Sequence, residues 1–274
     1  LGKFGIPIAC CTDGPSGLRM DVGTLAFSIP NGVCLACRFN EQLSIDLFDI
    51  MGVELRKNKI DTLLGPGMNL HRNPLNGRNF EYFGEDPYLA GEIASNYIKG
   101  VQSQNVLACI KHFAGNNQEW ARHSVSTDVD VRTLHEIYFP AFEKAVKEGD
   151  VATIMTSYNL LNSVHASESK YLNYDVLRDM WGFDGLVMSD WVSVYSPLNA
   201  GTYGVDLEMP YAKSLKPELI KSLVEQGVID ERALDIKCQN IIQTIFAFEF
   251  DKREQLDKSL PENNPECDAV AHKL

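Results

Sequence analysis

The segment Gly185-Leu186-Val187-Met188-Ser189-Asp190-Trp191 decides the fold. Its apolar residues, Leu186 to Met188, predict a short strand buried on both faces, which is typical of a parallel sheet covered by helices. The strand leads into a carboxylate, Asp190. A lone Asp after a strand more often caps the next helix than performs chemistry. In an α/β barrel, however, catalytic groups lie at the C-terminal ends of the strands, so the interpretation depends on which residues end the other strands.

Strand-like and helix-like segments alternate along the rest of the chain. We predict further strands at residues 6–11, 32–39, 62–64, 106–113, 152–158 and 205–209, and helices at 41–58, 87–104, 134–147, 170–181, 216–226 and 230–248. Connections of this length favour right-handed crossovers and a mainly parallel sheet. The sequence therefore predicts an α/β fold, a (β/α)8-like TIM barrel that lacks its first β/α unit in this chain. An open doubly wound sheet is the alternative, but no Gly-rich phosphate motif follows the first strand.

The chain is expected to divide into two regions. Residues 1–250 form the predicted barrel domain, and residues 251–274, which are charged and rich in Pro and Asn, are interpreted as a linker toward a second domain. The chain begins at Leu1 and not at Met, so we expect a native N-terminal portion to precede it.

Composition restricts the classes of ligand. The 274 residues carry a formal net charge of -12, which argues against nucleic acid and anionic membranes as partners. No apolar run reaches the length of about 18 residues that a membrane helix needs. The seven cysteines are odd in number and several lie in apolar runs, which favours buried free thiols and a cytoplasmic location. Cys34 and Cys37 have the spacing of a metal or redox pair, but no second pair follows, so neither a metal nor a cofactor is expected.

The strand ends carry polar and aromatic side chains that a barrel would bring to one mouth. Carboxylates among cationic donors, with an aromatic face nearby, suit a ligand rich in hydroxyl groups. Singly, each has a common structural explanation, such as a surface charge, a core histidine or half of an ion pair. Together they predict a binding pocket built from Asp13, Arg19, Arg78, Glu81, Lys111, His112, Tyr158, Asp190 and Trp191.

Several long motifs resemble those of glycoside hydrolase family 3. They are Asp13-Gly14-Pro15-Ser16-Gly17-Leu18-Arg19, Gly77-Arg78-Asn79-Phe80-Glu81-Tyr82-Phe83-Gly84-Glu85-Asp86-Pro87, Lys111-His112-Phe113-Ala114-Gly115-Asn116-Asn117-Gln118-Glu119 and Met188-Ser189-Asp190-Trp191. The resemblance covers almost the whole chain and implies the N-terminal barrel domain of a retaining enzyme of the β-glucosidase type. It implies Asp190 as the nucleophile, Tyr158 beside it, Trp191 as an aromatic wall, and sugar-binding roles for Asp13, Arg19, Arg78, Lys111 and His112.

The resemblance also implies that a catalytic group is missing. Retaining glycosidases need two carboxyl groups about 5 to 5.5 Å apart. In the β-glucosidase branch, the second is a Glu from a separate α/β sandwich domain. Glu81 and Glu119 are expected to orient cationic side chains, and Glu208 to be structural. Arg122 and His123 are interpreted as loop structure or as support at the pocket edge, since the sequence around His123 does not match the branch that uses a catalytic histidine.

The expected substrate is a β-glucoside or a short β-gluco-oligosaccharide, and the expected partners are the sandwich domain and, for a homo-oligomer, a second copy. A β-xylosidase, another β-glycosidase of the same family, and a catalytically incomplete sugar-binding subunit remain alternatives. A Schiff-base aldolase using Lys111 is disfavoured because neighbouring carboxylates oppose loss of the ammonium proton. A metal hydrolase is disfavoured because no paired His and carboxylate spacing occurs.

Overall fold

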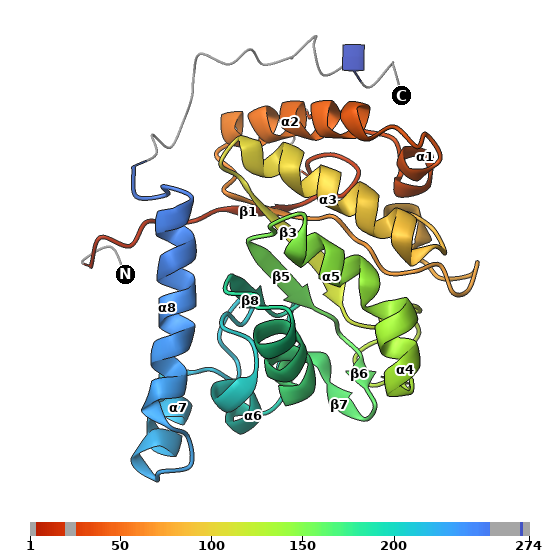
Figure 1. Cartoon of the computed structure of the whole chain (residues 1–274). Helices are drawn as coiled ribbons and strands as arrows, with labels where there is room; N and C mark the ends of the chain where they lie inside the picture. The colour runs from red at the N-terminus through yellow and green to blue at the C-terminus, as the bar shows by residue number, and fades with distance from the viewer. Residues whose placement is uncertain (1–3, 20–25, 253–268, 271–274) are drawn as a thin grey trace.

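A five-stranded parallel sheet forms the centre of the molecule (Figure 1). The computed structural model describes residues 4–19, 26–252 and 269–270. Every neighbouring pair of strands in this sheet is parallel. In spatial order the strands are β1 (Cys11–Asp13), β2 (Thr62–Leu64), β3 (Leu107–Phe113), β5 (Thr153–Thr156) and β8 (Leu186–Met188). The α/β class with a parallel sheet is therefore confirmed.

Three helices lie side by side along the outer face of this sheet (Figure 1). They are α2 (Glu41–Lys57), α3 (Pro87–Ser103) and α5 (Pro140–Lys147). Helix α2 starts where the Asn40 side chain accepts a hydrogen bond from the backbone N–H of Leu43. Helix α3 starts in the same way at Asp86, with proline at its first position. Both starts follow ordinary capping chemistry, which is why the sequence located these helices to within a residue or two.

The remaining elements surround the sheet. The helical ones are α1 (Gly32–Ala36), α4 (Val131–Thr133), α6 (Pro197–Tyr203), α7 (Pro217–Glu225) and α8 (Glu231–Ala247), with π-helical segments at Leu134–Tyr138 and Tyr171–Met180 and 3-10 turns at Asn79–Glu81 and Ala166–Glu168. A small separate sheet holds β4 (Ser126–Thr127), β6 (Leu160–Leu161) and β7 (Val164–His165).

Alternate residues of the central strands point to two different cores. The larger core lies between sheet and helices and includes Leu63, Ile110 and Val187. A smaller cluster on the opposite face contains Leu64, Cys109, Met155, Leu186 and Met188, with Cys11 packed against it. Because side chains alternate along a strand, the residue two positions later points to the same face. Asp13, two residues after Cys11, is thus expected on the same face as the smaller cluster. The same holds for Lys111 after Cys109 and for Asp190 after Met188.

Two predicted strands were placed wrongly. Residues 32–39 contain helix α1, which is capped by the Asn31 side chain accepting from the Cys34 backbone N–H. The predicted strand at 6–11 overlaps β1 only at its last residue, since β1 covers Cys11–Asp13 and Ile8 is 86% exposed. In both places an apolar run indicated a strand, and the structure shows that, apart from Cys11, these residues do not enter the sheet.

The predicted strand at 205–209 is an extended segment at the edge of the sheet beside β8. Its contacts are one bridge, between Met188 and Leu207, and hydrogen bonds such as that from the Ser189 N–H to the Leu207 carbonyl. Among the described residues, no backbone hydrogen bond joins this segment to β1. The sheet therefore has the parallel, helix-covered arrangement of a barrel, and its described part does not close.

The other structural predictions have mixed outcomes. The expectation of buried thiols is wrong for Cys10, Cys34, Cys37 and Cys238, which are exposed, and holds for Cys109. Cys267 and most of the predicted linker at 251–274 lie outside the described residues. In the described part of the chain, no helix is both long and apolar enough to cross a bilayer.

Candidate active site

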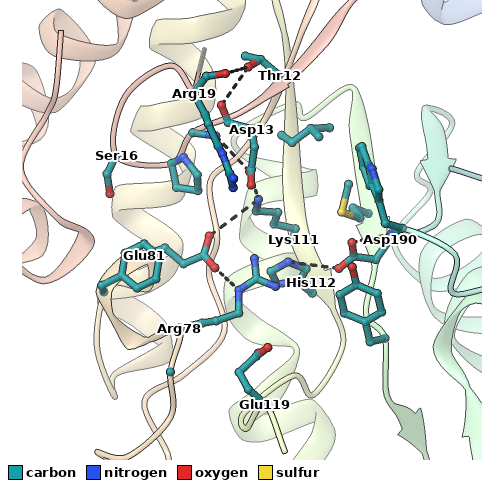
Figure 2. Close-up of a pocket in the computed structure, with 18 of the residues that line it drawn as sticks. Thr12, Asp13, Ser16, Arg19, Arg78, Glu81, Lys111, His112, Glu119 and Asp190 are labelled. Carbon is teal, nitrogen blue, oxygen red and sulfur yellow. Dashed lines mark hydrogen bonds and ion pairs between the residues drawn. The ribbon is translucent and has the colours of Figure 1, made fainter. Parts of the chain in front are cut away.

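A cavity of about 800 Å³ opens at the C-terminal ends of the central strands. Its volume lies in the range of small-molecule sites. All eight residues predicted as catalytic or substrate-binding line this cavity, although they come from separate segments of the chain (Figure 2). They are Asp13, Arg19, Arg78, Lys111, His112, Tyr158, Asp190 and Trp191.

Strand β3 contributes two adjacent residues, Lys111 and His112. Neighbouring residues of a regular strand point to opposite faces. The pairing of β3 with β5 is irregular between Ile110 and Phe113, and such a bulge re-aims side chains. Both side chains consequently reach the cavity and both are almost fully buried.

A row of alternating charges forms one wall of the cavity (Figure 2). Lys111 Nζ lies 2.5 Å from Asp13 Oδ1 and 3.8 Å from Glu81 Oε2. Arg78 Nε pairs with the other oxygen of Glu81. Burial opposes ionisation of Asp13, but the charge of Lys111 and its hydrogen bond outweigh burial and hold the Asp13 pKa below its usual value. Glu81 thus contacts two cationic side chains, Arg78 and Lys111, which agrees with the expectation that it orients such groups.

Asp190 lies across the cavity from this row and is only 6% exposed. Its Oδ1 accepts a hydrogen bond of 2.7 Å from the Trp191 backbone N–H. Its Oδ2 accepts no hydrogen bond from the described residues. Burial raises the pKa of Asp190, while the Trp191 N–H, the charges of Arg78 and Lys111 and the Tyr158 hydroxyl oppose that rise only in part.

His112 faces Asp190 as a neutral ring. Its Nε2 lies 3.6 Å from Asp190 Oδ2. Burial lowers the pKa of His112 well below its usual value, and the charges of Arg78, Lys111 and Arg122 lower it further. The contact with Asp190 is therefore that of a dipole with a carboxylate and not an ion pair. Among the described residues, no cation contacts Asp190 directly.

Tyr158 faces the same carboxylate from a packed position. The Arg122 guanidinium lies over its ring, 4.1 Å from the ring centroid, and the His123 ring centroid is 4.4 Å away. Burial and the neighbouring Asp190 raise the Tyr158 pKa, so the phenol keeps its proton. Arg122 and His123 thus support the pocket edge, which is one of the two roles expected from the sequence.

The three other carboxylates considered from sequence differ in their contacts. Glu119 Oε2 accepts from Arg122 Nη1 at 2.7 Å, and its Oε1 accepts from the Asn116 side chain at 3.2 Å. Glu208 accepts backbone N–H bonds from Ser214 and Leu215, which fixes the loop after the last extended segment. Glu208 does not line the cavity, whereas Glu81 and Glu119 do.

Sequence reasoning missed two buried side chains behind the cavity, Tyr82 and Asn116. The Tyr82 hydroxyl lies 3.1 Å from His112 Nδ1 and 3.2 Å from the Asn116 amide nitrogen. Both residues belong to the family motifs, but nothing in the spacing pairs a residue at 82 with residues at 112 and 116. Within the described residues, no group of three or more His, Cys, Asp or Glu side chains is arranged to hold a metal ion.

Residues 1–244 match the glycosyl hydrolase family 3 N terminal domain. The chain belongs to glycosyl hydrolase family 3. The family assignment made from the motifs is confirmed, and the chain can be compared with other family members.

The family 3 relatives include enzymes named for more than one activity. A β-glucosidase of Ruminococcus albus is 51% identical over 191 residues, which is 70% of this chain and 20% of the relative. An exo-α-(1→6)-L-arabinopyranosidase of Bifidobacterium longum is 42% identical over 252 residues, covering 88% of this chain and 33% of the relative.

Solved structures of family 3 match the entire chain. The β-glucosidase 3B of Thermotoga neapolitana in complex with α-D-glucose has a TM-score of 0.90 at 37% identity and covers 100% of this chain and 40% of its own. The β-glucosidase of Kluyveromyces marxianus in complex with glucose has a TM-score of 0.94 at 34% identity, covering 100% and 34%. The chain therefore spans well under half the length of these proteins.

Proposed function

We propose that this chain is the sugar-binding barrel of a retaining β-glucosidase in which Asp190 attacks the anomeric carbon. The observation that carries the proposal is Asp190 Oδ2, a buried carboxylate oxygen that accepts no hydrogen bond from the described residues and faces a cavity of sugar size. The names of the glucose-bound relatives support glucose as the sugar.

The row of charges suits the recognition of ring hydroxyls. Asp13 and Glu81 can accept hydrogen bonds from hydroxyl groups, and Lys111 and Arg78 can donate to them. Hydrogen bonds of this kind strengthen as the sugar ring distorts toward an oxocarbenium ion. Trp191 lines the same cavity and offers an apolar face to the ring.

In the proposed first step, Asp190 Oδ2 forms an ester bond to the anomeric carbon while the bond from that carbon to the leaving oxygen breaks. The leaving oxygen takes a proton from a general acid, and water later cleaves the ester with the same group acting as base. Trp191 N–H, hydrogen-bonded to Oδ1, holds the carboxylate in orientation throughout.

The general acid lies outside this cavity in our proposal. Within the described part of the chain, the cavity holds three further carboxylates, Asp13, Glu81 and Glu119, and each is paired with a Lys or Arg side chain. An ion-paired carboxylate lacks the proton that a general acid must donate. A Glu from a separate domain or chain fits the role, as the family resemblance implies.

The test compares two substrates on the intact chain. A dinitrophenyl β-glucoside has a leaving group that needs little protonation, whereas cellobiose needs a general acid. We expect slow release of dinitrophenol, no cleavage of cellobiose, and no release by Asp190→Asn. Equal rates on both substrates would contradict the proposal that the general acid lies outside this cavity. Full activity of Asp190→Asn would favour a different nucleophile.

A second glycone is favoured by one specific relative. The similar arabinopyranosidase of Bifidobacterium longum, at 42% identity, is an enzyme named for another sugar. Initial rates on dinitrophenyl β-glucoside, β-xyloside and α-L-arabinopyranoside distinguish these cases. We expect the glucoside to be fastest, and a faster rate on either pentoside would replace glucose in the proposal.

A further inference from the structure

We propose that Glu119 is a positioning residue that orients, through two separate sets of contacts, the two side chains facing Asp190. One set, made of hydrogen bonds, runs from Glu119 through Asn116 and Tyr82 to His112. The other runs from Glu119 through Arg122 to Tyr158. The inference rests on the proposed function, because it assigns Asp190 as the reacting group.

The first step fixes the Asn116 amide. A carboxylate oxygen only accepts hydrogen bonds, so the Asn116 group 3.2 Å from Glu119 Oε1 must be the NH2. The reversed amide would place two acceptors against each other. Asn116 is 1% exposed, so water does not offset that repulsion. The Glu119 carboxylate therefore decides which way the buried amide points.

The second step fixes the hydrogen-bond direction of the Tyr82 hydroxyl. The same Asn116 nitrogen lies 3.2 Å from the Tyr82 hydroxyl, and its second hydrogen is available for that contact. The Tyr82 oxygen then accepts from Asn116, and its own hydrogen is left to donate. His112 Nδ1, at 3.1 Å, is the acceptor that the structure supplies.

The third step sets the tautomer of His112. If Nδ1 accepts from Tyr82, the proton of the neutral ring resides on Nε2, the atom 3.6 Å from Asp190 Oδ2. The other neighbour of Nδ1 is Asn69 Oδ1, an acceptor that favours the opposite tautomer. It is farther away, at 3.3 Å, and it already accepts the His112 backbone N–H at 2.9 Å. The opposite tautomer would also aim the Nε2 lone pair at a carboxylate.

The second set of contacts uses the other oxygen of the same carboxylate. Glu119 Oε2 accepts from Arg122 Nη1 at 2.7 Å, and the Arg122 guanidinium lies over the Tyr158 ring. A guanidinium held over an aromatic face restrains the ring through the cation–π attraction. Tyr158 is thereby kept with its hydroxyl toward Asp190, whose ionised form it favours. One carboxylate thus serves both neighbours of Asp190.

Nitrogen-15 NMR of the histidine-labelled intact chain reads the tautomer directly. We expect His112 to carry its proton on Nε2 in the wild type. In Glu119→Gln, which keeps the shape of the side chain, the amide can donate as well as accept, so we expect both tautomers. Tyr82→Phe should also give both tautomers while leaving the Arg122 contact intact. Glu136→Gln is the matched control, because Glu136 pairs with Arg132 at 2.8 Å on the exposed surface.

A kinetic arm separates positioning from binding. With dinitrophenyl 2-deoxy-2-fluoro-β-glucoside, we expect Glu119→Gln to lower the limiting rate of covalent labelling about tenfold, the effect of one lost hydrogen bond in the transition state. The concentration giving half the limiting rate should not change. Arg122→Met should lower the same rate and leave the His112 tautomer as in the wild type.

A proton on Nδ1 in the wild type, or a Glu119→Gln chain with wild-type tautomer and labelling rate, would overturn the role of Glu119. A change of the same size in Glu136→Gln would overturn it as well. A wild-type chain that is never labelled at Asp190 would instead defeat the proposed function. The NMR comparison would then still decide whether Glu119 sets the tautomer, so the two failures are distinguishable.

Discussion

Asp190 and Asp206 flank the same strand, β8, and both are buried, yet their surroundings differ completely. Burial raises the pKa of each carboxyl. Asp206 uses both oxygens: Oδ2 accepts from Arg178 at 2.9 Å and from the Val187 N–H at 2.8 Å, and Oδ1 accepts from Asn240 at 3.0 Å. Asp190 leaves Oδ2 without a hydrogen bond from the described residues. A raised pKa therefore does not distinguish a reactive carboxylate from a structural one, whereas an unsatisfied oxygen in a cavity does.

The largest effect is expected at Asp190. Asp190→Asn removes the proposed nucleophile and should lower dinitrophenyl glucoside cleavage by more than about 10³-fold. The free energy of unfolding should stay equal or rise, because a buried carboxylate with one unsatisfied oxygen is replaced by a neutral amide. Cleavage assays and urea unfolding on one preparation measure both quantities. A strong loss of stability would show that Asp190, like Asp206, has a structural role.

The opposite result is expected at Asp206. Asp206→Asn leaves Arg178 and the buried Lys237 without their carboxylate and should lower the free energy of unfolding by about 3 kcal/mol or more. The folded fraction should still cleave the dinitrophenyl glucoside at the wild-type rate per active site. Active-site titration by covalent labelling supplies that normalisation. An unchanged urea midpoint would show that this cluster does not stabilise the fold.

Lys237 allows the same cluster to be tested by pH. It donates to the carbonyls of Gly204 and Val205, and burial lowers its pKa from 10.5 to about 8. Between these two values the unfolded chain binds a proton that the folded chain does not, so stability rises with pH. From pH 8 to pH 9.5 the gain should be roughly 1 to 2 kcal/mol. Lys237→Met should remove this gain, and a wild-type stability that falls over the same window would contradict the burial of the amine.

A smaller effect is expected at Tyr158. Tyr158→Phe removes a hydroxyl that favours ionised Asp190, so the Asp190 pKa should rise further above its ordinary value. The acid limb of the labelling rate should then shift to higher pH, and the limiting rate should fall about tenfold at most. A profile shifted to lower pH would show that Tyr158 disfavours the ionised carboxylate.

The sequence located the site better than it located the strands. Asp13 ends β1, Lys111 lies near the end of β3 and Asp190 follows β8. The C-terminal ends of parallel strands meet at one edge, so their convergence was predictable from order alone. The helix at 32–36 was not predicted, because its start depends on one capping side chain, Asn31. Over a segment this short, the apolar pattern predicted a strand, whereas the Asn31 cap favours a helix. The strand assignment at 32–39 followed the apolar pattern and was wrong.

The expectation that Glu119 orients a cationic side chain agrees with its contact to Arg122, but the contacts of Tyr82 and Asn116 behind the cavity could not be predicted. Tyr82, Asn116 and Glu119 meet His112 and Arg122 through side chains from two loops more than 30 residues apart in sequence. The spacing of residues in the sequence does not predict which buried amide contacts which hydroxyl. The roles of individual polar groups became arguable only when donor and acceptor atoms had distances.

The comparison between Asp190 and Asp206 is tested most directly by locating a covalent label. The intact chain is incubated with dinitrophenyl 2-deoxy-2-fluoro-β-glucoside, digested, and mapped by mass spectrometry. We expect one fluoroglucosyl group per chain, attached to Asp190, and none in the Asp190→Asn chain. A label on another carboxylate, or equal labelling of the Asp190→Asn chain, would contradict the account.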